Sequence, residues 1–278
     1  MNEFDLIKYN RTLSLFFFIS TLILFIASNY IFFEISNLMC LVLILAIGIT
    51  HGSLDNIKGK QLLKKFKIKN QLIFYVVYVL FALAVIIMWS ILPSLILFIF
   101  LIVASYHFGK EDSQFNLIDK KINNKLNILF LLKGSFIILV PLSFKYEQTV
   151  SIFSNLFLKD SAFFNILTFI KADQPIIGTS ILNILLIISV LAVLGISGHK
   201  KYLGLSEFLG GDTFIPDILS IIFLNVIFDP LIAFTIYFCF LHSPRHSLSL
   251  IKELDERNFR KGLKKFLKKA LPLTLITA

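Results

Sequence analysis

Residues 71–108 read QLIFYVVYVLFALAVIIMWSILPSLILFIFLIVASYHF and contain no Asp, Glu, Lys or Arg. A helix that crosses the ~30 Å hydrocarbon core of a bilayer needs about 20 mostly apolar residues, because it rises about 1.5 Å per residue. The stretch is long enough for two crossings, and Pro93 stands where the second would begin, a position that tolerates a missing backbone N–H. Residues 71–91 and 93–108 are therefore predicted to be neighbouring transmembrane helices.

Composition extends this interpretation to the whole chain. Of the 278 residues, 57% are hydrophobic and 16% are charged, whereas soluble domains average about 45–50% and about 25%. Further apolar runs of about this length lie at 12–33, 35–51, 127–144, 176–197, 214–229 and 231–248. We expect an all-α, polytopic membrane helix bundle with about eight transmembrane helices, forming a single integral-membrane domain over residues 1–278. Residues 270–278 begin another apolar run, which would be the start of a ninth span.

The distribution of positive charge predicts the orientation of the bundle. With the N-terminus in the cytoplasm, the inward-facing stretches carry 22 of the 27 Lys and Arg residues, while the outward-facing stretch 145–174 carries three. Basic residues concentrate in the cytoplasmic loops of membrane proteins. The chain is therefore expected to be a multi-pass protein of the inner cell membrane with a cytoplasmic N-terminus.

Two segments need a separate interpretation. Residues 149–170 are long enough to cross, but Lys159 and Asp160 fall at their middle, so we interpret them as a helix lying at the interface. Residues 249–270 carry eight basic residues between spaced Leu and Phe. This cytoplasmic segment is interpreted as an anchor on the anionic lipid bilayer, and nucleic acid is not expected as a partner.

Four of the five histidines fall at the predicted cytoplasmic ends of apolar runs. His51 ends the second run, His107 the fourth, and His242 and His246 the eighth, whereas His199 lies in a predicted loop. All three of these helices run from outside to inside, so the four imidazoles are expected at the same depth. His242 and His246 are spaced i and i+4 and share one helix face. The pattern predicts a metal site of four imidazoles toward the cytoplasmic side.

Acidic residues follow two of these histidines. Asp55 comes four residues after His51, and Glu111 and Asp112 come four and five residues after His107. Metal-bound histidines usually donate their second N–H to a carboxylate or carbonyl, so these three acids are candidates to orient the ligands. Imidazole suits Fe, Zn, Cu and Ni alike, so the donor type does not choose the metal.

Two classes of function fit a histidine cluster in such an apolar chain. A membrane transporter or metal carrier would spread polar residues across the depth of the bilayer, whereas here the histidines gather at one face. An enzyme would use the cluster as a site that a long apolar substrate reaches from the lipid. The clustering favours the enzyme with a single-metal site, and the transporter remains the alternative.

Three motifs carry a resemblance to a known family. They are His51-Gly52 followed by Asp55, the run Ser105–Gly109 (Ser-Tyr-His-Phe-Gly), and the run His242–His246 (His-Ser-Pro-Arg-His). Over nearly the whole chain, their order, spacing and predicted topology resemble the Brp/Blh family of bacterial and archaeal integral-membrane β-carotene 15,15′-dioxygenases.

The resemblance implies an activity and a cofactor. The activity is oxidative cleavage of the central double bond of β-carotene by O2, which gives two molecules of all-trans-retinal. The cofactor is a non-haem Fe(II), held by the histidines that match His51, His107, His242 and His246. The resemblance also implies that the retinal serves as the chromophore of a microbial rhodopsin.

Overall fold

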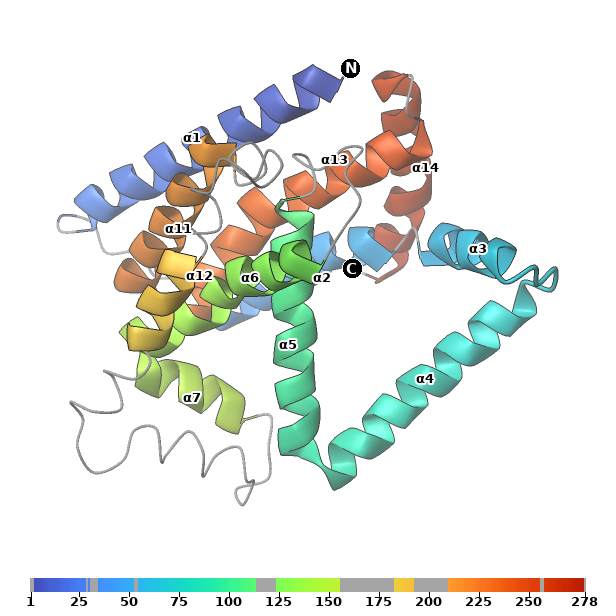
Figure 1. Ribbon diagram of the computed structural model, residues 1–278, viewed down its shortest axis with the longest axis horizontal. Helices are drawn as coiled ribbons and strands as arrows, with labels where there is room; N and C mark the ends of the chain where they lie inside the picture. Colours follow the sequence, from blue (N-terminus) through green and yellow to red (C-terminus); the bar gives the residue numbers. More distant parts are fainter. Residues whose placement is uncertain are drawn as a thin grey trace.

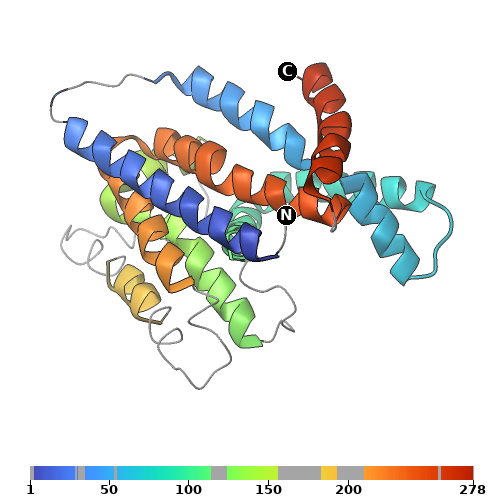
Figure 2. The same cartoon turned by 90° about the horizontal axis from the view of Figure 1, so that it is seen from above.

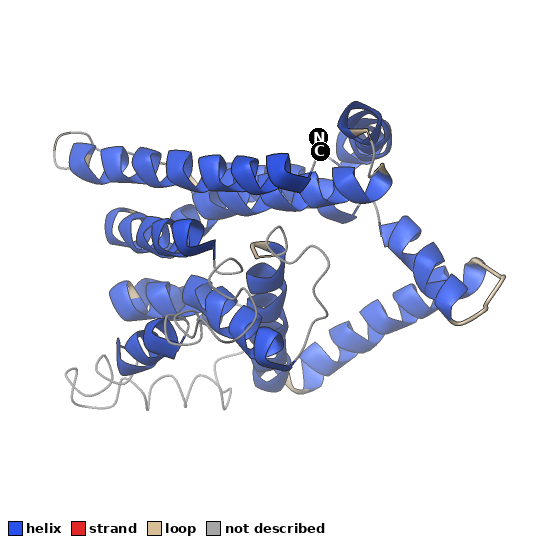
Figure 3. Ribbon diagram, turned by 45° about the horizontal axis from the view of Figure 1, so that its top comes forward, coloured by secondary structure: helices blue, strands red, loops and turns tan. Residues whose placement is uncertain are grey.

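The structure is a computed structural model that describes residues 3–28, 30, 35–52, 55–113, 124–155, 183–192, 210–255 and 258–277. The regular elements in these ranges are all helices (Figure 3). The first six are α1 (Glu3–Ala27), α2 (Asn37–Gly52), α3 (Asp55–Lys65), α4 (Leu72–Ile91), α5 (Pro93–Glu111) and α6 (Asn124–Phe144). The others are α7 (Tyr146–Ser154), a short helix at Asn183–Ala192, α11 (Gly210–Ile227), α12 (Pro230–Tyr237), the π-helix η2 (Phe238–His242), α13 (Ser243–Leu254) and α14 (Phe259–Thr277).

Four of the described helices, α1, α4, α5 and α6, are long and apolar enough to cross a membrane. Shorter apolar helices lie at Asn37–Ile47, Asn183–Ala192 and Thr213–Ile227. The all-α class is therefore confirmed, but the predicted count of about eight spanning helices is not. The run 231–248 is helical throughout, with the π-helix η2 between α12 and α13, and the end of the run 176–197 lies outside the described residues.

Other predicted segments are only partly described. Helix α7 covers the beginning of 149–170, and residues 156–182 lie outside the described residues. The interfacial interpretation of that stretch therefore stays a prediction. The basic segment 249–270 is shared between α13 and α14.

The helices differ in how deeply they enter the bundle. Figure 1 shows α5 standing upright, with α4 leaving its lower end at a wide angle. Helix α1 packs along α11, and η2 contacts both α1 and α2. Seen from above, α1, α13 and α2 run roughly alongside one another (Figure 2). The largest apolar core is built mainly from α6, α11 and α12, and it extends to Phe17 of α1 and Cys40 of α2.

The most extensive helix–helix contact joins α5 and α6. A Cβ atom added to Gly109 would lie 1.8 Å from the carbonyl oxygen of Phe130, and one added to Gly134 would lie 1.7 Å from that of Ser105. Only glycine allows the two backbones to approach this closely, as is common where helices pack in membranes. Gly109 belongs to the Ser-Tyr-His-Phe-Gly motif, so this crossing sets the position of the neighbouring His107.

Candidate active site

Three of the four predicted histidines come together in the fold. His107 lies on α5, His242 is the last residue of η2, and His246 lies in the first turn of α13. The ring centroid of His107 is 5.8 Å from that of His242 and 6.0 Å from that of His246. His242 and His246 are 6.3 Å apart and nearly parallel, as their i, i+4 spacing predicts. The side chain of the fourth histidine, His51, lies outside the described residues.

The burial of the three imidazoles is uneven. His242 is 0% exposed and His246 is 5% exposed, whereas His107 is exposed. The π-helix η2 places His242 at this interior position. Pro244 has no backbone N–H to donate to the carbonyl of Phe240 four residues earlier, which accounts for the wider turn directly before it. Single π turns of this kind occur frequently at functional sites.

Two of the predicted acids face the paired histidines. Nδ1 of His242 lies 2.9 Å from Oδ1 of Asp112, and Nδ1 of His246 lies 2.8 Å from Oε2 of Glu111. A histidine that donates Nδ1–H to a carboxylate keeps its Nε2 lone pair for a metal. Both acids follow His107 in the sequence, yet the structure places them against the histidines of η2 and α13. The side chain of the third candidate, Asp55, is not among those described.

A buried cluster of charges surrounds Asp112. Tyr237 donates its hydroxyl hydrogen to Oδ2 of Asp112, and a guanidinium nitrogen of Arg245 lies 3.7 Å from the same oxygen. Lys133 donates to the backbone carbonyl of Asp112 across 3.4 Å. Burial alone would raise the pKa of the Asp112 carboxyl, but His242, Arg245 and Lys133 together hold that pKa well below its usual range. Asp112 is therefore a charged acceptor at neutral pH.

Arg245 is the centre of this cluster and is fully buried, with 0% exposure. Its Nε donates to Oδ1 of Asn10 at 2.7 Å, and its terminal nitrogen pairs with Oδ1 of Asp217 at 3.0 Å and also donates to Ser14. Asp217 in turn lies 3.7 Å from Nζ of Lys133. Arg245, which lies between His242 and His246 in the sequence, thus ties α13 to α1, to α11 and to the end of α5.

The sequence interpretation missed this cluster, although a signal was present. Lys133, Asp217 and Arg245 are ionisable residues inside predicted apolar runs. Charged side chains within such runs are costly unless they face the bundle interior and pair with one another. Searching the runs for charges of opposite sign would have proposed these partners.

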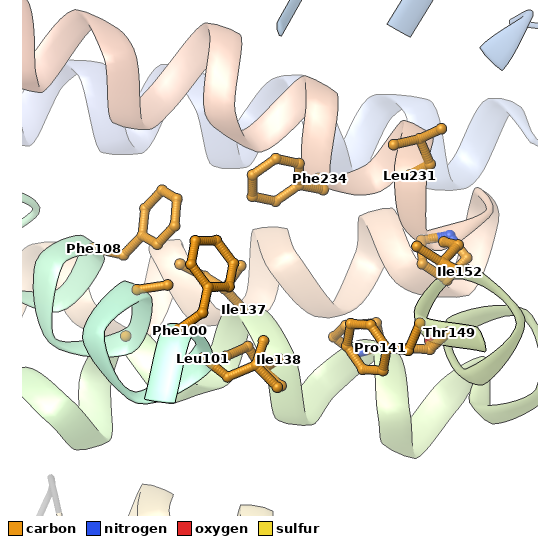
Figure 4. Close-up of a pocket in the computed structure, with 14 residues that line it drawn as sticks. Phe100, Leu101, Phe108, Ile137, Ile138, Pro141, Thr149, Ile152, Leu231 and Phe234 are labelled. Carbon is orange, nitrogen blue, oxygen red and sulfur yellow. The ribbon is translucent and has the colours of Figure 1, made fainter. Parts of the chain in front are cut away.

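An apolar cavity of about 260 Å³ lies at the end of the histidine group. It is enclosed by residues of α5, α6, α7 and α12, and Figure 4 shows its lining. Among its described lining residues, Thr149 is the one with a polar side chain. The ring of Phe108 lines the cavity and also packs edge-on against His242, with centroids 4.5 Å apart. Phe108 is thus the contact between the cavity and the histidines.

The three imidazoles are suitable metal ligands, but their rings lie further apart than the rings of histidines bound to one ion. Imidazoles bound to one ion at about 2.1 Å place their ring centroids roughly 5 Å apart. The three centroids here are 5.8 to 6.3 Å apart. In the described part of the chain, accordingly, no three His, Cys, Asp or Glu side chains converge closely enough to hold a metal ion.

Comparison with known proteins agrees with the motifs. A family model described as beta-carotene 15,15′-dioxygenase matches residues 42–278. A beta-carotene 15,15′-dioxygenase from the uncultured marine bacterium 66A03 is 30% identical over 222 residues, which are 80% of this chain and 72% of that protein. No solved structure matches.

Two buried imidazoles and one exposed imidazole lie beside an apolar cavity, in a bundle with helices long and apolar enough to span a membrane, and this arrangement suits a substrate dissolved in lipid. The chain belongs to the β-carotene 15,15′-dioxygenase family. It is therefore an enzyme of the dioxygenase class, and the transporter or metal-carrier alternative is not favoured.

Proposed function

We propose that the protein cleaves the central 15,15′ double bond of β-carotene with O2 at a non-haem Fe(II) centre and releases two molecules of all-trans-retinal. The observation that carries this proposal is the meeting of His107, His242 and His246 at one end of an apolar cavity. β-Carotene has no polar group, so it gains free energy wherever apolar side chains replace water around it. A cavity with almost no polar lining suits such a substrate.

The metal would be held by His107, His242 and His246 together with His51. Helix α2 contains His51 in its last turn and contacts both η2 and α13, which supports a common site. When bound, the iron supplies the redox chemistry that activates O2.

Protein residues have two tasks in this scheme. Asp112 and Glu111 accept Nδ1–H from His242 and His246, which fixes each ring in one tautomer and one rotation. Arg245 and its partners keep Asp112 charged and in place. A ligand set held in advance loses less entropy when the metal binds.

The reaction balances without a further reductant. The carbon–carbon double bond breaks, both atoms of one O2 are taken up, and each carbon becomes an aldehyde carbonyl. The protein must therefore choose which double bond lies beside the histidines, and positioning is its main contribution to selectivity.

Bacterial cells that make β-carotene offer a direct test. Production of the unsubstituted chain in these cells is expected to remove the orange colour and to yield retinal. His246→Ala should abolish both carotene loss and bound iron, because it deletes one of the four imidazoles. His199→Ala is the matched control and should retain both. Unchanged carotene with the unsubstituted chain would overturn the proposal.

Location and product use are part of the same proposal. We expect the chain to lie in the inner membrane with a cytoplasmic N-terminus, the histidines toward the cytoplasmic side and retinal passing to a microbial rhodopsin. The exposed lysines of α14, among them Lys264, Lys265 and Lys268, support a cytoplasmic position for residues 249–270. Reporter fusions to the N-terminus test the orientation, and a periplasmic signal would contradict it.

A further inference from the structure

The cavity beside the histidines has two different ends. Figure 4 shows Phe108 at one end and Thr149 with Ile152 at the other, with α6 and α12 forming the long sides. Along α6 the lining extends from Gly134 to Pro141, which is about 10 Å at 1.5 Å per residue. The cavity is therefore elongated, and the histidines lie at one end of its long direction.

The α7 end of the cavity is bounded in part by buried side chains. Thr149 is 4% exposed and donates its hydroxyl hydrogen to the backbone carbonyl of Lys145 at 2.8 Å. Val150 and Leu142 form a small apolar cluster at the same junction of α6 and α7. On the α5 side, Phe100 lines the cavity and is 57% exposed, which makes this side the candidate entrance for a lipid-dissolved molecule.

The volume of the cavity matches part of a long substrate. Pockets that enclose a whole ligand measure about 300–1,000 Å³, and this one measures about 260 Å³. β-Carotene has two equivalent halves, and its central bond lies where they join. A cavity that is bounded at α7 and takes one half therefore places the central bond near its other end, beside Phe108.

We propose that this cavity acts as a one-sided ruler for the polyene. The ring of one half stops against Thr149 and Ile152, and the distance from α7 to the histidines selects the central double bond. This inference rests on the proposed carotene cleavage and adds the residues that determine which bond is cut. It assigns specificity to α7, which carries none of the candidate metal ligands.

Substitutions at Ile152 change the length of the ruler in both directions. Ile152→Ala moves the closed end away from the histidines, so the polyene enters further and the bond beside the histidines is no longer central. Ile152→Phe moves the closed end toward them and pushes the polyene out. Thr149→Ala is a second lengthening variant, and Gln148→Ala, at an exposed position of the same helix, is the matched control.

The experiment compares products from the full chain in lipid membranes supplied with β-carotene, Fe(II) and O2. The unsubstituted chain and Gln148→Ala are expected to give retinal alone. Ile152→Ala and Thr149→Ala should raise the share of unequal apocarotenal pairs several-fold, and Ile152→Phe should lower kcat/KM for β-carotene about tenfold. Thermal unfolding checks that each variant is folded.

The experiment distinguishes failure of the proposed ruler from failure of the proposed carotene cleavage. If folded variants at Ile152 and Thr149 release retinal alone at the unsubstituted rate, the ruler is wrong while carotene cleavage stands. If the unsubstituted chain consumes no carotene, the proposed function fails and the ruler fails with it.

Discussion

Helix α4 consists of apolar and aromatic residues almost throughout, yet none of its side chains is buried, whereas the segment formed by η2 and α13 buries His242, Arg245 and His246. The difference follows from the solvent. Lipid tails are as apolar as leucine, so α4 loses little by facing them. Charged and hydrogen-bonding groups have no partners in lipid and are driven into the interior, where they find one another. In this fold the buried histidines and charged residues lie in the interior, and the exposed face of α4 is apolar.

The largest effect is expected from removing the buried arginine. Arg245→Leu removes one of the two buried cations beside Asp217 and Asp112 and leaves Lys133 as the other, and breaking a buried pair typically costs about 3–5 kcal/mol. Thermal unfolding in detergent should show a large fall in Tm. Adding Asp217→Asn should recover part of the loss, and a single variant as stable as the unsubstituted chain would break the comparison.

The close crossing of α5 and α6 is the next test. In Gly134→Ala the new Cβ would collide with the carbonyl oxygen of Ser105, and overpacking of this kind costs about 1–3 kcal/mol. Ala82→Leu on the exposed helix α4 is the control and should leave Tm unchanged. Equal effects at the two positions would mean that α4 is packed in the membrane as tightly as α5.

Asp112→Asn is expected to weaken metal binding. The amide accepts a hydrogen bond from His242 less strongly than a carboxylate does. Loss of such a partner typically lowers metal affinity about 10–100-fold, and we expect a fall of about tenfold for this substitution. Iron titration of the purified chain measures this change, with Asp229→Asn at an exposed position as the control. Unchanged iron affinity would remove Asp112 from the site.

The lowered pKa of the Asp112 carboxyl predicts that folding stability depends on pH. Its folded-state pKa is lowered, so the stability that Asp112 contributes is complete at neutral pH and is lost as the pH falls through the lowered pKa. Acid titration of Tm should therefore show a smaller acid-induced loss in Asp112→Asn than in the unsubstituted chain. A difference that grows as the pH falls would contradict this sign.

The smallest change in Tm is expected when an exposed apolar side chain of α4 is shortened. Leu80→Ala exchanges one apolar side chain for a smaller one at a lipid-facing position, so Tm should change by less than the Gly134→Ala variant changes it. A loss of several kcal/mol, as buried Leu→Ala substitutions give in soluble cores at about 2–5 kcal/mol, would show that α4 is covered by a partner.

Much of the fold class and part of the site could be predicted from the sequence. Apolar run length identified α4, α5 and α6, and the start of α5 at Pro93 was correct. The π turn η2 between α12 and α13 was not predicted, because a hydropathy pattern does not reveal a local change of helical geometry. His107, His242 and His246 stood out in the sequence because histidine is rare in this chain, and they lie near one another in the structure, while their role as metal ligands stays a prediction.

The sequence could not say which histidine each acid faces. Glu111 and Asp112 follow His107, but side chains at the end of a helix reach across to neighbouring helices. Their pairing with His246 and His242 depends on how the end of α5 packs against η2 and α13. Arg245 was missed although its charge inside an apolar run was a signal that it pairs with other buried charges.

We propose above all that the site formed by His107, His242 and His246 cleaves a symmetric polyene at its central double bond. The most direct measurement is product analysis after the purified full chain, in lipid and with Fe(II), is given β-carotene and O2. The account predicts two molecules of retinal for each β-carotene consumed, and none from His242→Ala. A chain that leaves β-carotene intact, or that releases two unequal apocarotenals, would contradict it.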